Sequence, residues 1–346
     1  MNVLITCAGR RNYLVEYFKT ALDHSGLVFA ADASAHAPAL YSADRSLLTP
    51  SVHEPDHLEA LLDVCRRNEI ELLVSVNDLE LPRLAASSSL FAEAGTHVLV
   101  SDPSAVEICA DKLKTGDFLE AHGFDYPRTA ATAAAAQQLL ETGGLLFPLV
   151  VKPRFGSASL AVEIVGNESE LAAALALADS RVRRSPLSQM AIPDSESAIL
   201  VQEFVPGDEY GLDVLNDLDG RYVATAVKKK LLMRAGETDR AVTVRDGRLE
   251  DLGASLGRAV RHVGVLDCDV IVYGERLAVI DMNPRFGGGY PFSHAAGVDM
   301  PAAVLSWLRG EEPDPGWFRC RPGVASAKYD VLMPVSDVRP EPTRRS

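Results

Sequence analysis

Short apolar runs alternate with amphipathic stretches along the first hundred residues. NVLIT (2–6), LVFAAD (27–32) and IELLVSV (70–76) have the length of strands, whereas RNYLVEYFKTAL (11–22) and HLEALLDVCRRN (57–68) carry apolar residues at helical spacing. Strands separated by helix-length segments are typical of a parallel sheet covered by helices. We therefore expect a doubly wound α/β domain in this part of the chain.

The loops at the carboxyl ends of such strands are where an open α/β sheet binds ligands. AGRR (8–11), ADAS (31–34) and VNDLE (76–80) occupy those positions. The single glycine at position 9 does not make the G-x-G-x-x-G pattern of a dinucleotide site. The pattern therefore disfavours a dehydrogenase.

A change of pattern after residue 100 predicts a second unit. SDPS (101–104) supplies turn and cap residues before a helix that carries Lys112, and the alanine-rich stretch 129–147 is interpreted as another helix. From FPLVVKP (147–153) onward the apolar period becomes strand-like, and hairpins alternate with helices, as in an α+β domain with antiparallel sheets.

These patterns divide the chain into three parts. We expect a preceding α/β domain over 1–110, a two-lobed domain over 111–310 with lobes at 111–198 and 199–310, and an extension over 311–346 whose end is loosely held. RRSPLSQMAIPDSES (183–197) is interpreted as an exposed loop.

The overall charge excludes some partners. A formal charge of −14 and a pI near 5.0 oppose binding to nucleic acid or to an anionic membrane. The order of charges near the N-terminus is wrong for a secretory signal, and no apolar run reaches about 18 residues, so we expect a cytoplasmic protein. Its five scattered cysteines are expected to be reduced core residues.

A lysine followed by small residues suggests a phosphate site. An apolar strand ends at Lys152, and the loop that follows contains Gly156, Ser157 and Ser159, whose backbone amides could hold a polyphosphate. Taken alone, Lys152 could equally be a strand-end lysine that extends into water.

Two further stretches fit a nucleotide. In QEFVPGDE (202–209), Glu203, the backbone at Phe204 and Val205, and Glu209 could contact an adenine edge and ribose hydroxyls. The stretch VKKKLLMRAGETDR (227–240) is basic within an acidic protein and is interpreted as an anion-binding loop that contains Lys228, Lys230, Arg234 and Arg240.

The segment around residues 267–285 contains the metal candidates. Asp281, Asn283 and Arg285 alternate along a strand and therefore share one face. A two-residue turn at 274–275 would place Asp269 opposite Ile280, whereas a longer turn or a bulge would place it opposite Asp281; we expect the second register. Adjacent carboxylates repel each other unless a cation lies between them, and oxygen ligands favour Mg²⁺ or Mn²⁺.

The ordered set of motifs resembles the ATP-grasp superfamily, most closely a single synthetase unit of the carbamoyl phosphate synthetase large chain. The resemblance covers roughly residues 100 to 310, and the first hundred residues resemble the domain that usually precedes it. It rests on Lys112, VVKPRFGSAS (150–159), VQEFVPGDEYGLDV (201–214), CDVIVYGERLAVIDMNPRFGGG (268–289) and AAGVDMPAAVL (295–305).

The resemblance implies a role for each matching residue. Lys112 and Lys152 would contact phosphates, Glu203 and Val205 the adenine, and Glu209 the ribose. Mg²⁺ would be held by Asp269, Asp281 and Asn283. The catalytic candidates are Arg285, which would stabilise the reacting phosphoryl and acyl oxygens, with Lys230 and Arg234. The glycine loop departs from the family pattern, since Ala158 stands where glycine is frequent.

The function expected from this resemblance is an ATP-dependent carboxylate-amine ligase that forms an amide through an acyl phosphate and releases ADP and phosphate. The chain holds one synthetase unit and no glutaminase, so we expect a free-standing ligase rather than a carbamoyl phosphate synthetase. The alternatives are transfer of the acyl group to a peptide or carrier protein, and a nucleotide-binding module without catalysis.

The substrates are not identified by the sequence. We expect a small carboxylate and an amine, with amino acids as first candidates, and leave a homodimer open. Asn77, Asp78, Glu80 and the arginines of AGRR could reach the acceptor, although Arg10 and Arg11 could equally be ordinary first-turn helix residues.

Overall fold

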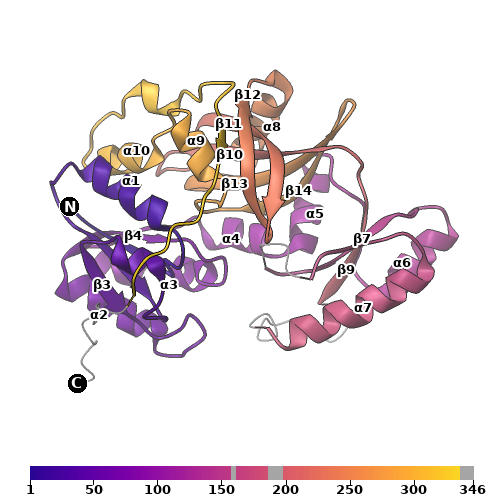
Figure 1. Ribbon diagram of the computed structural model, residues 1–346, viewed down its shortest axis with the longest axis horizontal. Coiled ribbons are helices and arrows are strands. Elements are labelled where there is room, and N and C mark those ends of the chain that lie inside the picture. Colours follow the sequence, from indigo (N-terminus) through magenta and orange to yellow (C-terminus); the bar gives the residue numbers. More distant parts are fainter. Residues whose placement is uncertain (157–160, 186–197, 336–346) are drawn as a thin grey trace.

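The first domain is a five-stranded parallel sheet. The computed structural model of the 346-residue chain describes residues 1–156, 161–185 and 198–335 (Figure 1). The strands are β1 (Asn2–Thr6), β2 (Val28–Asp32), β3 (Arg45–Leu48), β4 (Ile70–Ser75) and β5 (His97–Leu99), in the order β3-β2-β1-β4-β5. All of these pairs are parallel, which confirms the predicted sheet.

Helices cover both faces of this sheet. α1 (Asn12–Leu22) packs on Val3 and Ile5, whereas α2 (His57–Arg67) and α3 (Leu81–Glu93) pack on Leu4 from the opposite side. Successive residues of β1 thus enter different cores because strand side chains alternate between faces. A short 3₁₀ helix, η1 (Pro38–Tyr41), follows β2.

The helix expected to carry Lys112 is in fact two helices, α4 (Pro103–Ala110) and α5 (Lys112–Ala121). The break falls at Asp111, which has extended backbone angles and accepts a hydrogen bond from the amide of Leu113. Arg154 binds the same carboxylate at 2.6–2.7 Å. Asp111 therefore caps α5 and ties its first residue, Lys112, to the strand that carries Lys152.

The first lobe of the second domain is a small antiparallel sheet with helices on it. Its strands are β6 (Thr129–Ala130), β7 (Leu149–Pro153), β8 (Glu163–Val165) and β9 (Ile199–Glu203), in the order β6-β9-β7-β8. The alanine-rich stretch forms α6 (Ala133–Glu141), as expected, and α7 (Glu168–Arg183) shares a hydrophobic core with it and with β7. This lobe projects to the right in Figure 1.

The second lobe is a six-stranded antiparallel sheet, which confirms the α+β prediction. Its strands are β10 (Asp208–Asn216), β11 (Tyr222–Arg234), β12 (Glu237–Val244), β13 (Gly264–Tyr273), β14 (Arg276–Asn283) and β15 (Ala325–Ala327), in the order β14-β13-β10-β11-β12-β15. α8 (Gly247–Val260) packs on this sheet. The interpretation of 227–240 as a loop is wrong, since these residues form the β11–β12 hairpin.

The last helices join the two domains. α9 (Tyr290–Ala295) and α10 (Met300–Leu308) share one hydrophobic core with α1 and β1 of the first domain. Within the extension, the 3₁₀ helix η3 (Pro315–Phe318) packs on this core, and β15 adds a strand to the second lobe. Residues 336–346, where we expected a loosely held end, and most of the expected loop at 183–197 lie outside the described residues.

Candidate functional site

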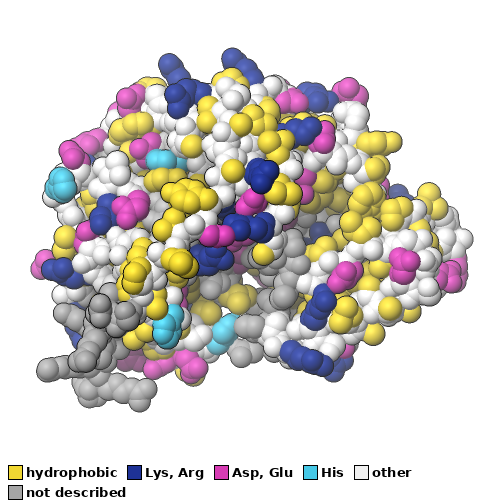
Figure 2. Space-filling view, in the orientation of Figure 1, with side chains coloured by type: hydrophobic (Ala, Val, Ile, Leu, Met, Phe, Trp, Pro, Cys, Tyr) yellow, Lys and Arg dark blue, Asp and Glu magenta, His cyan; other side chains and the backbone are white. Residues whose placement is uncertain are grey.

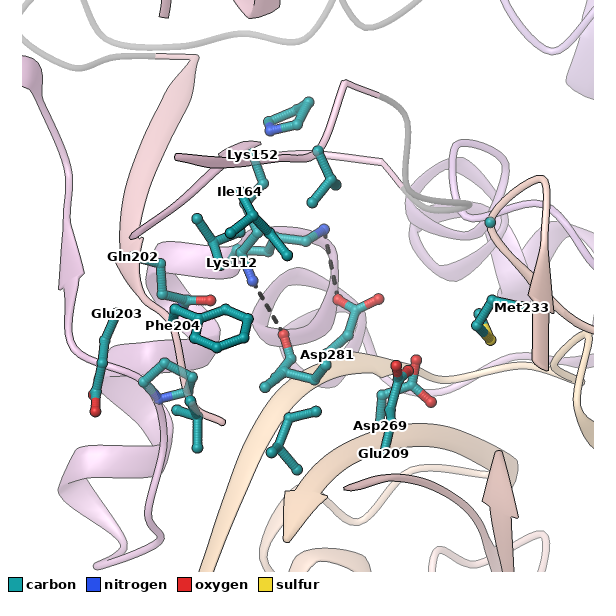
Figure 3. A pocket seen from close by; sticks show the side chains of 18 of the residues that line it. Lys112, Lys152, Ile164, Gln202, Glu203, Phe204, Glu209, Met233, Asp269 and Asp281 are labelled. Carbon is teal, nitrogen blue, oxygen red and sulfur yellow. Dashed lines mark hydrogen bonds and ion pairs between the residues drawn. The ribbon is translucent and has the colours of Figure 1, made fainter. Parts of the chain in front are cut away.

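A cavity of about 410 Å³ lies where the two lobes meet (Figure 3). Its walls include β7 and β9 from the small sheet and β10, β13 and β14 from the large one. The structure brings the following predicted residues to this cavity: Lys112, Lys152, Gly156, Glu203, Phe204, Val205, Glu209, Asp269 and Asp281. Ser157 and Ser159 lie outside the described residues.

The β13–β14 hairpin has the register that we expected. It begins at the tight turn with Tyr273 opposite Arg276 and continues to Val270 opposite Val279. A bulge then skips Ile280, so Asp269 pairs with Asp281. The bulge, not a longer turn, therefore brings the two carboxylates together.

Two lysines face these acids. Lys152 is buried, and its Nζ donates to the carbonyl of Ile280 at 3.2 Å. Lys112 Nζ donates to the carbonyl of Gly156 at 2.6 Å and lies 3.5 Å from Asp281 Oδ1. Burial, with a contribution from the nearby charge of Lys112, lowers the pKa of Lys152 to about 8.

The paired carboxylates have different electrostatic surroundings. Burial raises the pKa of Asp269 to about 7, with Asp267 and Glu209 adding to the effect and Lys230 opposing it. At Asp281 burial acts in the same direction, but Lys112 and Lys152 outweigh it and lower the pKa. Asp281, Asp267 and Glu209 thus lie around Asp269 in a partly desolvated space. A bound cation would reduce the repulsion among these carboxylates.

Lys230 offsets part of the repulsion among these carboxylates. Its Nζ lies 2.6 Å from Glu209 and 2.7 Å from Asp269, and these two acids raise its pKa although burial opposes them. Lys230 is therefore held between Glu209, which we expect to contact the ribose, and Asp269, which we expect to bind the metal.

At the far end of the cavity, Glu203 is engaged with other protein groups. Its carboxylate accepts hydrogen bonds from Arg276 and from the amide of Arg128, and the bond with Arg276 is the main reason that the pKa of Glu203 is lowered. Apolar side chains from Val150 and Ile271 complete this end. A nucleotide contact from Glu203 stays a prediction.

A second cavity, of about 70 Å³, adjoins the first. The two share Met233, Gly236, Asp269 and Asp281 as lining residues. The smaller cavity is also lined by Arg11, Lys230, Glu237, Asp267, Asn283 and Arg285. It is thus strongly polar, with three cations beside several acids. Figure 2 shows several Lys and Arg side chains beside acidic ones near the middle of the face that it presents, with others distributed toward its edges.

Arg285 and Arg11 both connect the first domain to this cavity. Arg285 contacts Asp78 and Asp267 at 2.9 Å, and Arg11 lies 2.9 Å from Glu237. Sequence reasoning missed Asp267 and Glu237. Asp267 could have been found, because it lies two residues before Asp269 and so shares its strand face.

Three basic residues of the β11–β12 hairpin do not reach either cavity. Lys228 is fully buried, 2.6 Å from Asp213, and so has a structural role instead of the predicted phosphate contact. Arg234, expected to be catalytic, is exposed and pairs with Asp239 and Asp330. Arg240 is exposed too. Lys228 and Lys230 share one face of β11, and what separates them is their surroundings: Lys228 meets the buried Asp213, whereas Lys230 meets Glu209 and Asp269.

The residues present fit Mg²⁺ in part. No cluster of three or more His, Cys, Asp or Glu side chains that could hold a metal ion occurs among the described residues. Asp269 and Asp281 with the amide of Asn283 nevertheless supply oxygen atoms beside a cavity of nucleotide size. Mg²⁺ is commonly held by one or two carboxylates together with the phosphates of its substrate, so a set this small is sufficient.

Comparison with known families identifies this arrangement. Residues 109–289 match the family described as the ATP-grasp domain, and residues 3–99 match the PylC-like N-terminal domain. The first match spans more than half of the chain. The chain belongs to the ATP-grasp family. Both parts of the predicted fold, the parallel sheet and the two-lobed domain, are thereby confirmed.

Relatives of this ATP-grasp protein are much longer chains. The carbamoyl phosphate synthase large chain of Rubrobacter xylanophilus is 27% identical over 271 residues, which are 75% of this chain and 24% of the relative. That of Thermotoga neapolitana is 24% identical over 73% of this chain and 22% of the relative. The chain thus spans about a quarter of the length of these relatives.

Solved structures show the same fold. Biotin carboxylase from Campylobacter jejuni superposes with a TM-score of 0.73 at 16% identity, covering 92% of this chain and 73% of that one. L-amino acid ligase from Bacillus licheniformis superposes with a TM-score of 0.68 at 19% identity, covering 93% and 78%. Among the described residues, no helix combines the length and the apolar character needed to cross a bilayer.

Proposed function

We propose that this ATP-grasp protein is an ADP-forming ligase that activates a carboxylate with ATP and joins it to an amine. The observation that carries the proposal is the junction of the two cavities at Asp269 and Asp281. One cavity has the size for a nucleotide, and the other is small and lined by the cations Arg11, Lys230 and Arg285 together with four acids. The γ-phosphate of ATP in the first would thus lie next to an anionic substrate in the second.

The two reaction steps require no nucleophilic side chain. An oxygen of the carboxylate attacks the γ-phosphorus, the bond to the β-phosphate oxygen breaks, and ADP leaves. The amine nitrogen then attacks the acyl carbon, phosphate departs, and the nitrogen loses a proton to solvent. The protein contributes position and electrostatic stabilisation.

Individual residues would divide this work. Lys112 and Lys152 bind the phosphates, and Asp269, Asp281 and Asn283 hold Mg²⁺, which would neutralise charge on the phosphate oxygens. Arg285 and Lys230 line the smaller cavity, where charge develops on the transferred group. Arg11, which lines the same cavity and pairs with Glu237, would bind the substrate carboxylate.

The smaller cavity also suggests the class of carboxylate. Its volume of about 70 Å³ accommodates a few atoms, so a small acid such as bicarbonate, or only the carboxylate end of an amino acid, would enter it. The names of similar proteins, which include biotin carboxylase and L-amino acid ligase, support both candidates. Amino acids remain our first choice, because acids and cations together suit a zwitterion.

The test is ADP release from Mg-ATP with amino acids, small acids and bicarbonate, offered singly and in pairs with amines. We expect release to require a specific carboxylate, and hydroxylamine to trap the acyl phosphate as a hydroxamate. Asp281→Asn is the control, because an ATPase contaminant would be unaffected by it. Saturable Mg-ATP binding without turnover for any pair would instead favour the non-catalytic nucleotide-binding module, and turnover only with a peptide or carrier protein would favour the other alternative.

A further inference from the structure

The guanidinium of Arg285 is held by carboxylates from two domains. Its Nε lies 2.9 Å from Asp78 Oδ1, and its Nη2 donates to Asp78 Oδ2 at 3.0 Å. Its Nη1 donates to Asp267 Oδ2 at 2.9 Å. Asp78 therefore contacts one side of the guanidinium with both carboxylate oxygens, through one hydrogen bond and one close ion-pair contact, and so restricts the orientation of the guanidinium plane.

The turn that carries Asp78 is itself fixed by buried polar contacts. It lies between β4 and α3, where Asn77 Oδ1 accepts from the amide of Leu79 at 2.9 Å. Glu80 is fully buried, and its carboxylate accepts from Thr6 Oγ1 at 2.5 Å, from Ser75 Oγ, and contacts His57 Nε2 at 2.7 Å. Since three neighbouring segments hold Glu80, the carboxylate two residues earlier has little freedom to move.

The other partner of Arg285 is held equally tightly. A Cβ atom on Gly287 would lie 2.2 Å from the Asp267 carboxyl carbon, so the backbone of the glycine loop packs directly against this carboxylate. Arg285 has only 9% of its side chain exposed. Arg285 donates one hydrogen bond to Asp78 and one to Asp267, and its Nε lies in ion-pair contact with Asp78. Arg285 also lines the smaller cavity.

We propose that Asp78 is a positioning residue, through which the first domain orients Arg285 toward the group transferred in the reaction. This inference rests on the proposed function. An arginine stabilises a transition state only when its donors point to where charge develops, and preorganised donors need no rearrangement at that moment. Without Asp78 the guanidinium would keep one carboxylate contact, to Asp267, and could rotate about it.

The first experiment is kinetic and uses Asp78→Asn, which preserves the shape of the side chain but removes the charge that contacts the guanidinium. We expect kcat to fall tenfold or more, while the KM for ATP changes less than twofold. In an Arg285→Lys background the same substitution should change kcat less than twofold, because Asp78 acts through the arginine fork. The matched control is Asp330→Asn, which breaks another contact between the domains, with Arg10 and Arg234, and should leave kcat unchanged.

An unchanged kcat in Asp78→Asn, or an equal loss in both backgrounds, would overturn the proposal. The second experiment does not depend on turnover. The Nε–H resonance of Arg285, assigned by its loss in Arg285→Lys, should exchange slowly with solvent in the wild type and in Asp330→Asn. It should exchange at least tenfold faster in Asp78→Asn. If the ligase assay fails but the exchange rates differ in this way, the proposed function is rejected and the role of Asp78 in holding Arg285 is retained. Equal exchange rates would reject that role.

Discussion

Asp281 lies directly opposite Asp269 because Ile280 is an extra residue in β14. In the regular ladder that begins at the turn, Ile280 would have taken that position and Asp281 would have faced the other side of the sheet. The bulge has a second effect: the carbonyl of Ile280 accepts a hydrogen bond from Lys152. One inserted residue thus brings together the two acids and one of the two lysines of the proposed phosphate site.

Replacing Asp281 by Asn should separate binding from folding. The substitution keeps the shape of the side chain but removes the charge that Lys112 and Lys152 offset and that a bound cation would need. We expect turnover to fall by a factor of 100 or more and the affinity for Mg-ATP to fall tenfold, with little change in Tm. Titration of Mg-ATP by calorimetry measures the affinity. Asp208→Asn, an exposed ion-pair residue on β10, is the control and should behave as wild type.

Lys152 should be unfavourable for stability but necessary for nucleotide binding. Its pKa is lowered from 10.5 to about 8, which corresponds to an electrostatic cost on the order of 3 kcal/mol for the buried charge. Lys152→Met removes this charge, so the Tm of the nucleotide-free protein should stay equal or rise, while the Kd for Mg-ATP increases at least tenfold. A Tm several degrees lower with unchanged Kd would show that the lysine serves packing alone.

Gly287 should tolerate no side chain. Its Cβ would lie 2.2 Å from the carboxyl group of Asp267, which would be pushed away from Arg285. Gly287→Ala should therefore reduce kcat strongly and destabilise the fold by roughly 1–3 kcal/mol, as overpacking does. At Gly247, the first residue of α8, no atom lies within 4 Å of the added Cβ. Gly247→Ala should be neutral or slightly stabilising in urea unfolding; equal behaviour of both variants would contradict the steric argument.

His262 should make the fold sensitive to acid. It is fully buried, its Nε2 lies 3.0 Å from the Val214 carbonyl, and burial lowers its pKa from 6.5 to about 4. The unfolded chain therefore binds a proton between about pH 6.5 and 4 that the folded chain excludes, so stability is lost as the pH falls through this window. At pH 5 the loss is on the order of 2 kcal/mol relative to pH 8.

The measurement for His262 is the difference in the free energy of unfolding between pH 8 and pH 5, by urea titration. His262→Gln removes the titrating group, so this difference should shrink by about 2 kcal/mol even where the variant is less stable throughout. An identical difference in both proteins would exclude His262 as the source. The matched control is His36→Gln, the same substitution at an exposed histidine.

Much of this protein could be predicted from local pattern. Apolar residues at every second position indicate strands such as 70–75, and apolar residues at helical spacing indicate helices such as 57–67. Each spacing follows from backbone geometry alone. The order of the motifs likewise indicated the ATP-grasp family, and the shared face of Asp281 and Asn283 required only the alternation of a strand. Arg285 lies beyond the end of β14 at Asn283, so alternation does not place it.

What only the tertiary structure decided are the contacts between segments distant in the chain. Lys228 and Lys230 are equivalent in sequence, yet Lys228 pairs with buried Asp213 and Lys230 with Glu209 and Asp269. The neighbouring strands and α9 create that difference. Asp78 meets Arg285 across 207 residues for the same reason. Local periodicity specifies which face a side chain takes, but the charges that it meets there depend on how separate elements pack, and no local pattern contains that information.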